Sequence, residues 1–270
     1  MSQPHRVIIF AGSDSSGCAG LQTDLSTLQG LRIHGLSVAT AITAQTASAV
    51  TALEPVSLAT ITAQFRAAEE VGFAAGKTGL LVGWEVIKLV SDLWESKPEV
   101  PLVVDPVLAS SSGRRFLDRK ARQFMITRLL PVASVVTPNV PEAGWMVGRR
   151  LEGQGELEAA AREIQAWGVP TVVIKGGHGP ARNLVHDLVV TPETAHWFSD
   201  TRLDTRNSRG TGCMLSTAIA AFLALGLDSL SAVRRARDIV RTGLGSGYSL
   251  DTQPGPAGGW PEVQDSDPPK

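Results

Sequence analysis

Cysteine is scarce in this sequence. Cys18 and Cys213 are the only two in 270 residues, and they lie far apart. A secreted scaffold held by disulfides would carry more, so we expect a reduced, intracellular protein.

An excess of one charge is also missing, with 25 Lys and Arg against 26 Asp and Glu. Without a basic excess the chain cannot neutralise a nucleic-acid backbone, so no nucleic-acid partner is predicted.

Long hydrophobic runs are absent as well. The apolar residues 7–10 are far fewer than the about 20 that a membrane-spanning helix needs. The same run lacks the longer apolar region and the cleavage site of a signal peptide. The five histidines show no spacing typical of a structural zinc site. We therefore expect a cytoplasmic protein with no membrane partner.

Short apolar runs alternate with segments of helical periodicity. The runs predict strands at residues 6–10, 36–41, 100–105, 134–136, 171–175 and 184–190. Between them, apolar residues recur at helical spacing, as in Leu21, Leu25 and Leu28. This alternation predicts an α/β fold with a central, mainly parallel sheet and helices on both faces. The length suits a single domain over residues 1–245, followed by a Gly- and Pro-rich surface tail over 246–270.

The loop after the first predicted strand is rich in glycine. Gly12 and Gly17 have the spacing that begins a Walker A loop, but Cys18 and Ala19 stand where that loop needs Lys and Ser or Thr. A second segment, 72–78, places only three residues between its glycines where the Walker spacing requires four. Neither is predicted to be a P-loop, and the first segment suits an ordinary strand-to-helix turn equally well.

Three later strand ends carry polar side chains, and ligands of such sheets bind beyond the carboxyl ends of the strands. Asp105 closes a buried strand before a proline, which suits either a ligand-facing carboxylate or a turn. Asn139 and Glu142 open a helix, where they either hold a hydrated Mg²⁺ through waters or form an ordinary cap. Lys175 closes a strand and precedes glycines, which places an ammonium where it can reach a phosphate.

The strongest candidate is the segment 207–213, which leads into a long apolar helix. The first N–H groups of a helix have no intrahelical acceptor, so Gly210, Thr211 and Gly212 predict an anion site at the positive end of the helix dipole. Cys213 lies in the same turn, and its thiol pKa is expected to be lowered there. The alternative for Cys213 is a small buried hydrophobic side chain.

Taken in this order, the motifs resemble the hydroxymethylpyrimidine/phosphomethylpyrimidine kinases of the ribokinase-like superfamily. The resemblance covers about residues 7–244 and is carried by segments 11–17 (AGSDSSG), 19–24 (AGLQTD), 40–45 (TAITAQ), 77–80 (KTGL), 104–107 (VDPV), 137–142 (TPNVPE), 175–178 (KGGH) and 210–213 (GTGC). It implies a three-layer ribokinase-like fold and an Mg-ATP-dependent kinase. The implied reaction is phosphorylation of 4-amino-5-hydroxymethyl-2-methylpyrimidine, and then of its monophosphate to the diphosphate, in thiamine biosynthesis.

The resemblance also implies roles for single residues. Catalysis is assigned to Cys213, Gly210 and Gly212. Substrate contacts are assigned to Gly12, Asp24, Thr43, Gln45, Leu80 and Val107. Nucleotide contacts are assigned to Lys175, Gly176 and Thr211, and Mg²⁺ or its waters to Asp105, Asn139 and Glu142. ATP is the implied phosphoryl donor, the pyrimidine is the implied partner, and a homodimer is favoured.

Some positions depart from the pattern of this family, and two other functions stay open. Cys18 replaces a usual Gly, Thr46 a common Asn, and Arg209 a common His.

A pyridoxine/pyridoxal kinase of the same superfamily is the nearest alternative, although the amide of Gln45 suits an aminopyrimidine edge. A catalytically silent pyrimidine-binding module is the other. An NAD-binding protein is disfavoured because no Gly-x-Gly-x-x-Gly follows the first strand.

Overall fold

The computed structural model describes residues 5–46, 49–108, 116–177, 183–250 and 253–258. These residues form a nine-stranded sheet in the order β3-β2-β1-β4-β5-β6-β7-β8-β9. The strands are β1 (Arg6–Asp14), β2 (His34–Gln45), β3 (Val50–Pro55), β4 (Ala75–Thr78), β5 (Leu102–Val104), β6 (Val135–Val136), β7 (Thr171–Ile174), β8 (Leu184–Val190) and β9 (Ala195–Thr201). The α-helices are α1 (Gly20–Gly30), α2 (Leu58–Val71), α3 (Trp84–Glu95), α4 (Arg119–Phe124), α5 (Val140–Val147), α6 (Gln154–Gln165), α7 (Thr211–Ala224) and α8 (Ser229–Gly245).

The centre of the sheet is parallel. β2, β1, β4, β5, β6 and β7 pair in parallel with their neighbours, whereas β3 at one side and β8 and β9 at the other are antiparallel. The predicted mainly parallel sheet is therefore confirmed. In such a sheet the carboxyl ends of the parallel strands meet at one edge, and that edge is where a ligand site is expected.

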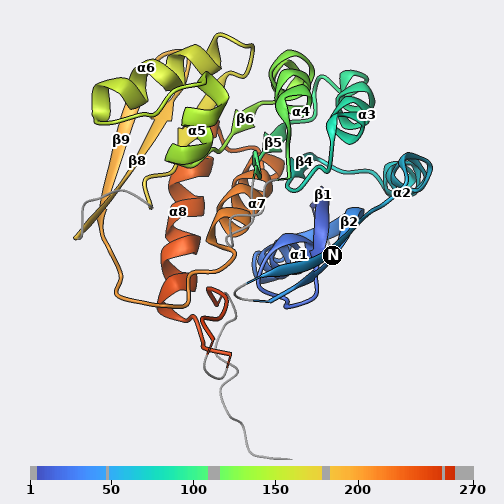
Figure 1. Cartoon of the computed structure of the whole chain (residues 1–270), viewed down its shortest axis with the longest axis horizontal. Helices are drawn as coiled ribbons and strands as arrows, with labels where there is room; N and C mark the ends of the chain where they lie inside the picture. Colours follow the sequence, from blue (N-terminus) through green and yellow to red (C-terminus); the bar gives the residue numbers. More distant parts are fainter. Residues whose placement is uncertain (1–4, 47–48, 109–115, 178–182, 251–252, 259–270) are drawn as a thin grey trace, which may run out of the picture.

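Alternating side chains of the strands build two cores. In β1, Ile8 and Phe10 face one side, while Val7, Ile9 and Ala11 face the other. The first core is covered by α2, α3, α4, α5 and α6, and the second by α1, α7 and α8. Figure 1 shows α7 and α8 side by side across one face of the sheet. Because both faces are covered, the central strands β5 and β6 consist of apolar residues only, as expected for a buried parallel sheet.

The predicted strands agree with the observed ones, apart from their ends. β8 has the predicted bounds, and β1 and β2 extend four residues further than predicted at their carboxyl ends, to Asp14 and Gln45. Three strands were missed: β3, β4 and β9. β4 consists of small and polar residues (AGKT), so it has no apolar run to reveal it.

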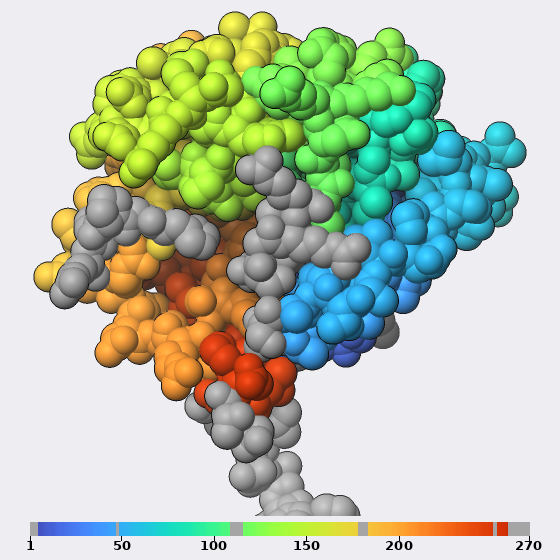
Figure 2. Space-filling model, in the orientation of Figure 1, coloured from blue at the N-terminus to red at the C-terminus, as the bar shows by residue number. Residues whose placement is uncertain are grey.

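The residues after α8 return to the body of the protein. A parallel backbone bridge joins Arg209 to Pro256, and Ala257 is buried. In Figure 2 these red residues lie against the orange surface that precedes α7. Of the predicted surface tail, residues 255–258 are thus packed, whereas Tyr248 and Leu250 are exposed. The end of the 175–178 segment, at His178, lies outside the described residues. None of the helices in the described part is both long and apolar enough to span a bilayer.

Candidate active site

The exits of β1, β2 and β4 bring several predicted substrate contacts together. Gly12 and Leu80 touch, since a β-carbon at Gly12 would lie 3.0 Å from Leu80 Cδ2. The Thr43 hydroxyl donates to the carbonyl of Ser13 at 2.9 Å, which ties the end of β2 to the end of β1. The backbone N–H of Gln45 donates to the Ser15 hydroxyl at 2.9 Å. Gln45 is therefore held at the strand end beside the glycine-rich loop.

Asp24 lies in α1 and is buried there with partners from other parts of the protein. It has no exposed surface, its Oδ2 lies 2.7 Å from Lys77 Nζ, and its Oδ1 accepts from Thr217 Oγ1 at 2.7 Å. Burial raises the pKa of Asp24, and Lys77 opposes that rise. Because both carboxylate oxygens already have protein partners, the predicted substrate contact needs correction: Asp24 supports the site from within the core.

Asp105 and Lys175 form a second ion pair, at the ends of β5 and β7. Lys175 Nζ lies 3.0 Å from Asp105 Oδ1, and the hydroxyls of Thr137 and Ser216 donate to the same carboxylate at 3.4 Å each. A β-carbon at Gly212 would lie 3.4 Å from Lys175 Nζ. The start of α7 is thus placed directly against the Lys175 ammonium. Val107, the remaining predicted substrate contact, is partly buried just beyond β5.

Asn139 and Glu142 form a capping box at the start of α5. The Asn139 side chain accepts from the Glu142 backbone N–H at 2.8 Å, and Glu142 Oε2 accepts from the Asn139 N–H at 2.7 Å. Burial raises the pKa of Glu142 to about 7, while Lys175 opposes the rise and Asp105 adds to it. The predicted helix cap is therefore present, the role of the pair toward Mg²⁺ stays a prediction, and the Glu142 carboxyl interacts electrostatically with Asp105 and Lys175.

The first turn of α7 carries the predicted anion site. Gly210 has a φ of 78°, and a β-carbon there would lie 2.5 Å from the carbonyl oxygen of Cys18. Only glycine suits this left-handed, tightly packed position. The Met214 N–H is the one that bonds back to the Gly210 carbonyl, at 2.8 Å. The N–H groups of residues 211–213 precede it and lack an intrahelical acceptor, as at every helix start.

The predicted lowering of the Cys213 pKa is wrong. Burial raises the pKa of this thiol to about 11, although Lys77 and the backbone N–H of Gly20 favour the thiolate. Asp24 and Asp105 add to the rise because they disfavour a further negative charge. The loss of hydration and the two nearby carboxylates raise the pKa of Cys213 more than the helix start lowers it. Cys213 is therefore a neutral thiol at physiological pH and can donate an S–H hydrogen bond.

This protonation state can be tested by alkylation. We expect the rate of Cys213 modification by iodoacetamide to rise about tenfold per pH unit up to at least pH 9.5, because only the thiolate reacts and its fraction grows below the pKa. Mass spectrometry of the Cys213 peptide measures the rate without interference from Cys18. A plateau near pH 7 would show that the thiol has the lowered pKa of a helix-start cysteine.

Comparison with known proteins identifies the family. A family model described as phosphomethylpyrimidine kinase matches residues 14–258, which is most of the chain. The chain belongs to this family. It is 39% identical over 259 residues to a hydroxymethylpyrimidine/phosphomethylpyrimidine kinase from Streptomyces coelicolor, covering 95% of both chains.

Two solved structures share the fold. A pyridoxal kinase from Staphylococcus aureus, in complex with AMP-PCP and pyridoxal, matches with a TM-score of 0.88 and 30% identity, over 97% of this chain and 96% of that one. A phosphomethylpyrimidine kinase from Clostridium difficile matches with a TM-score of 0.77 and 33% identity, over 88% of this chain and 98% of that one. The phosphomethylpyrimidine kinase family thus shares a three-layer, ribokinase-like fold with pyridoxal kinases, and the present chain is an ATP-dependent kinase.

One site residue of this kinase was missed at the sequence level. Lys77 was set aside with a false phosphate loop, yet it is fully buried, and a β-carbon at Gly79 would lie 3.0 Å from its Nζ. Burial tends to lower the pKa of Lys77, but Asp24, Cys213 and Asp105 outweigh it and raise the pKa. The sequence carries no clear signal for this role, because the small and polar residues of β4 do not reveal that Lys77 lies in a central strand.

The C-terminal segment of the kinase braces the anion-site loop. Asn207 Oδ1 accepts from the Gly255 N–H at 3.1 Å and from the Ser249 hydroxyl at 3.2 Å, and its Nδ2 donates to the Gly247 carbonyl at 3.3 Å. Arg209, which replaces a common histidine, lies 4.0 Å from Asp14, the last residue of β1. The loop before α7 is therefore held both by the C-terminal segment and by the end of β1.

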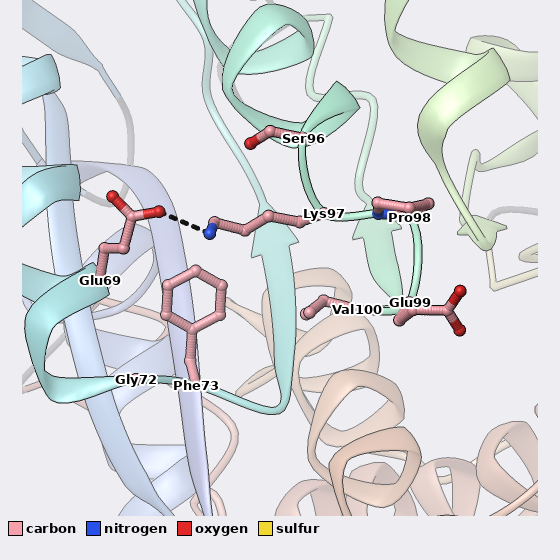
Figure 3. A pocket seen from close by; sticks show the side chains of 8 residues that line it. All are labelled: Glu69, Gly72, Phe73, Ser96, Lys97, Pro98, Glu99 and Val100. Carbon is pink, nitrogen blue, oxygen red and sulfur yellow. Dashed lines mark ion pairs between the residues drawn. The ribbon is translucent and has the colours of Figure 1, made fainter.

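A cavity of about 320 Å³ lies at the opposite edge of the sheet. Figure 3 shows that Glu69, Phe73 and Lys97 line it, and Lys97 lies 2.5 Å from Glu69 in an ion pair. Its residues lie where α2 and α3 end and where β4 and β5 begin. Because the anion site is at the carboxyl ends of these strands, the cavity is not part of the active site.

Proposed function

We propose that this kinase transfers the γ-phosphoryl group of ATP to 4-amino-5-hydroxymethyl-2-methylpyrimidine, and then to its monophosphate, in thiamine biosynthesis. One observation carries the proposal. The start of α7 lies against the Asp105–Lys175 pair, with Gly212 close to Lys175 Nζ. Backbone N–H groups and an ammonium thus converge at one point, as stabilisation of a transferring phosphoryl group requires.

The pyrimidine would lie between the loop after β1 and the ends of β2 and β4. Leu80 supplies an apolar surface beside Gly12, and the side-chain amide of Gln45 offers both a donor and an acceptor to the aminopyrimidine edge. Thr43 is buried and its hydroxyl donates to the Ser13 carbonyl, so it fixes the end of β2 against the end of β1. Val107 adds apolar surface from β5.

The nucleotide would lie on the other side of α7, against Lys175, Gly176 and Thr211. Burial tends to lower the pKa of Lys175, but Asp105 and Glu142 outweigh it and raise the pKa. Lys175 is therefore charged at neutral pH and suited to a phosphate oxygen. The Thr211 hydroxyl donates to the Ser208 carbonyl at 3.0 Å. Its backbone N–H lies in the first turn of α7, where it has no intrahelical acceptor and can donate to a phosphate.

A magnesium ion fits this site through waters. The Asn139 oxygen accepts from the Glu142 N–H, and one oxygen of Asp105 accepts from Lys175, so these atoms are already engaged. Among the described residues there is no group of three or more His, Cys, Asp or Glu that could hold a metal ion. Asp105 and Glu142 would therefore hold the waters of an Mg²⁺ bound chiefly by phosphates, as is usual for this ion. When bound, Mg²⁺ would neutralise charge that develops on the phosphates.

In the transfer itself, the substrate oxygen forms a bond to the γ-phosphorus as the bond from that phosphorus to the ADP oxygen breaks. In the first transfer the substrate hydroxyl loses its proton to water. The N–H groups of residues 211–213 and the Lys175 ammonium stabilise the migrating group. The neutral thiol of Cys213 donates to one of its oxygens. This role suits a thiol whose pKa is raised to about 11, because a thiolate would repel the phosphoryl group.

A substrate panel tests the proposal. With Mg²⁺ and ATP, we expect the larger kcat/KM values for hydroxymethylpyrimidine and its monophosphate, and smaller values for pyridoxine and pyridoxal. The reason is that Gln45 is placed to pair with an aminopyrimidine edge. ADP release measures the rates. Gln45→Leu, tested on the same panel, should raise KM for the pyrimidines and leave the pyridoxal values unchanged.

A pyridoxal kinase is the second candidate, and one observation favours it. The TM-score with the Staphylococcus aureus pyridoxal kinase, 0.88, exceeds the 0.77 with the Clostridium difficile phosphomethylpyrimidine kinase. A larger kcat/KM for pyridoxal in the panel would select this activity over the pyrimidine. An absence of ATP consumption with every substrate would instead indicate a silent binding module. A homodimer in the cytoplasm stays a prediction.

A further inference from the structure

The turn at Lys175 and Gly176 is held from behind by a carboxylate of β8. The Gly176 N–H donates to Asp187 Oδ1 at 2.8 Å. A β-carbon at Gly176 would collide with the His186 carbonyl oxygen, so the turn rests directly on the strand. On the other side, the Lys175 N–H donates to the Pro138 carbonyl at 2.9 Å. The backbone that presents the Lys175 ammonium is therefore clamped between β8 and the exit of β6.

An arginine of α8 orients that carboxylate. Arg237 Nε donates to Asp187 Oδ2 at 2.8 Å, and Arg237 Nη2 donates to Asp200 Oδ2 of β9 at 2.6 Å. The side chains of Arg237 and Asp187 are only 11% and 13% exposed, so solvent screens the pair little. The guanidinium also lies 4.6 Å from the centre of the Phe198 ring. Asp187 is thus held by a planar group that is itself fixed on three sides.

We propose that Asp187 and Arg237 are positioning residues for the nucleotide: they fix the Lys175–Gly176 turn so that its ammonium and N–H groups meet the phosphates. Neither residue would touch a ligand. The inference rests on the proposed nucleotide contact of Lys175. Because the turn belongs to the nucleotide side of α7, loosening it should weaken the binding of the nucleotide and leave the binding of the pyrimidine unchanged.

The expected effect follows from the lost hydrogen bond. Asp187→Ala removes the acceptor of the Gly176 N–H and leaves Arg237 with one carboxylate partner. We expect ADP to bind about tenfold more weakly, the effect of losing one charge-assisted hydrogen bond. Arg237→Gln should act in the same direction, and Arg237→Lys should recover part of the loss because it keeps the charge. The pyrimidine should bind all of these variants as it binds the parent.

Isothermal titration of each purified full-length variant with ADP, and separately with hydroxymethylpyrimidine, measures both affinities. Arg235→Ala is the matched control. Arg235 lies on α8 two residues before Arg237, and its guanidinium lies 5.3 Å from the centre of the Phe222 ring. This variant should leave both affinities unchanged. If the pair had a purely structural role, its loss would weaken the binding of both ligands. If the pair positions the turn, its loss weakens the binding of ADP alone.

Lys175→Met separates this inference from the proposed function. Weaker ADP binding in Lys175→Met supports the proposed nucleotide contact, and unchanged ADP binding overturns it. The positioning inference has its own test: unchanged ADP affinity in Asp187→Ala, or equal weakening of ADP and pyrimidine, overturns it whatever Lys175→Met shows. If Asp187→Ala does not fold, the same two outcomes are decided with Arg237→Gln.

Discussion

Replacing Cys213 with alanine is expected to lower kcat at least about 100-fold, the usual cost of removing one preorganised donor to a transition state. The thiol lies in the first turn of α7, beside the N–H groups that would hold the phosphoryl group. Its contribution is realised only while charge develops during transfer. The dissociation constant for the pyrimidine should therefore change little. Steady-state kinetics and pyrimidine titration of the same preparation provide the two numbers.

A serine at the same position is the informative control. Cys213→Ser keeps a donor of similar size, so we expect it to retain more activity than Cys213→Ala at pH 7. If Cys213 instead acted as a thiolate, serine would be as inactive as alanine, because its hydroxyl does not ionise in this range. Near-normal turnover of Cys213→Ala would remove Cys213 from the mechanism altogether.

Replacing Lys77 alone is expected to destabilise the protein by about 3–5 kcal/mol, the cost of leaving one partner of a buried ion pair uncompensated. Lys77 and Asp24 have no exposed side-chain surface and lie 2.7 Å apart. In Lys77→Met, Asp24 would remain buried with only Thr217 as its partner. Urea unfolding at pH 7, compared with the parent protein, measures the loss.

The loss of stability in Lys77→Met is expected to depend on pH in one direction. Burial already raises the pKa of Asp24 in the folded protein, and removing Lys77 raises it further. An acid with a raised folded pKa loses stability as pH rises above its unfolded pKa. The defect of Lys77→Met should therefore be smaller at pH 5 than at pH 8.

Two controls test the pairing itself. Lys77→Met combined with Asp24→Asn removes the unpaired charge, so the double variant should be more stable than Lys77→Met. Arg150→Met breaks an ion pair with Glu152 whose side chains are 89% and 69% exposed, and it should change stability little. A double variant no more stable than Lys77→Met would show that the lost packing of the lysine chain, rather than the charge, causes the defect.

Much of the fold was determined by the sequence on its own. The alternation of apolar runs and helical stripes predicted the parallel sheet, and the exits at Gly12, Asp105 and Lys175 lie at its carboxyl edge as expected. The Asn139–Glu142 cap was also foreseeable. These features depend on residues close in sequence, or on the rule that parallel strands end at the same edge, so a linear pattern suffices to predict them.

The tertiary structure alone decided how the charges of the site are used. Asp24 pairs with Lys77, 53 residues away, and with Thr217, 193 residues away. No local sequence pattern therefore indicates that both of its carboxylate oxygens have protein partners. The pKa of Cys213 illustrates the same point. Its helix-start position favours a lowered pKa, but burial raises it to about 11. Desolvation depends on every segment that surrounds a group, and those segments come together only when the whole chain has folded.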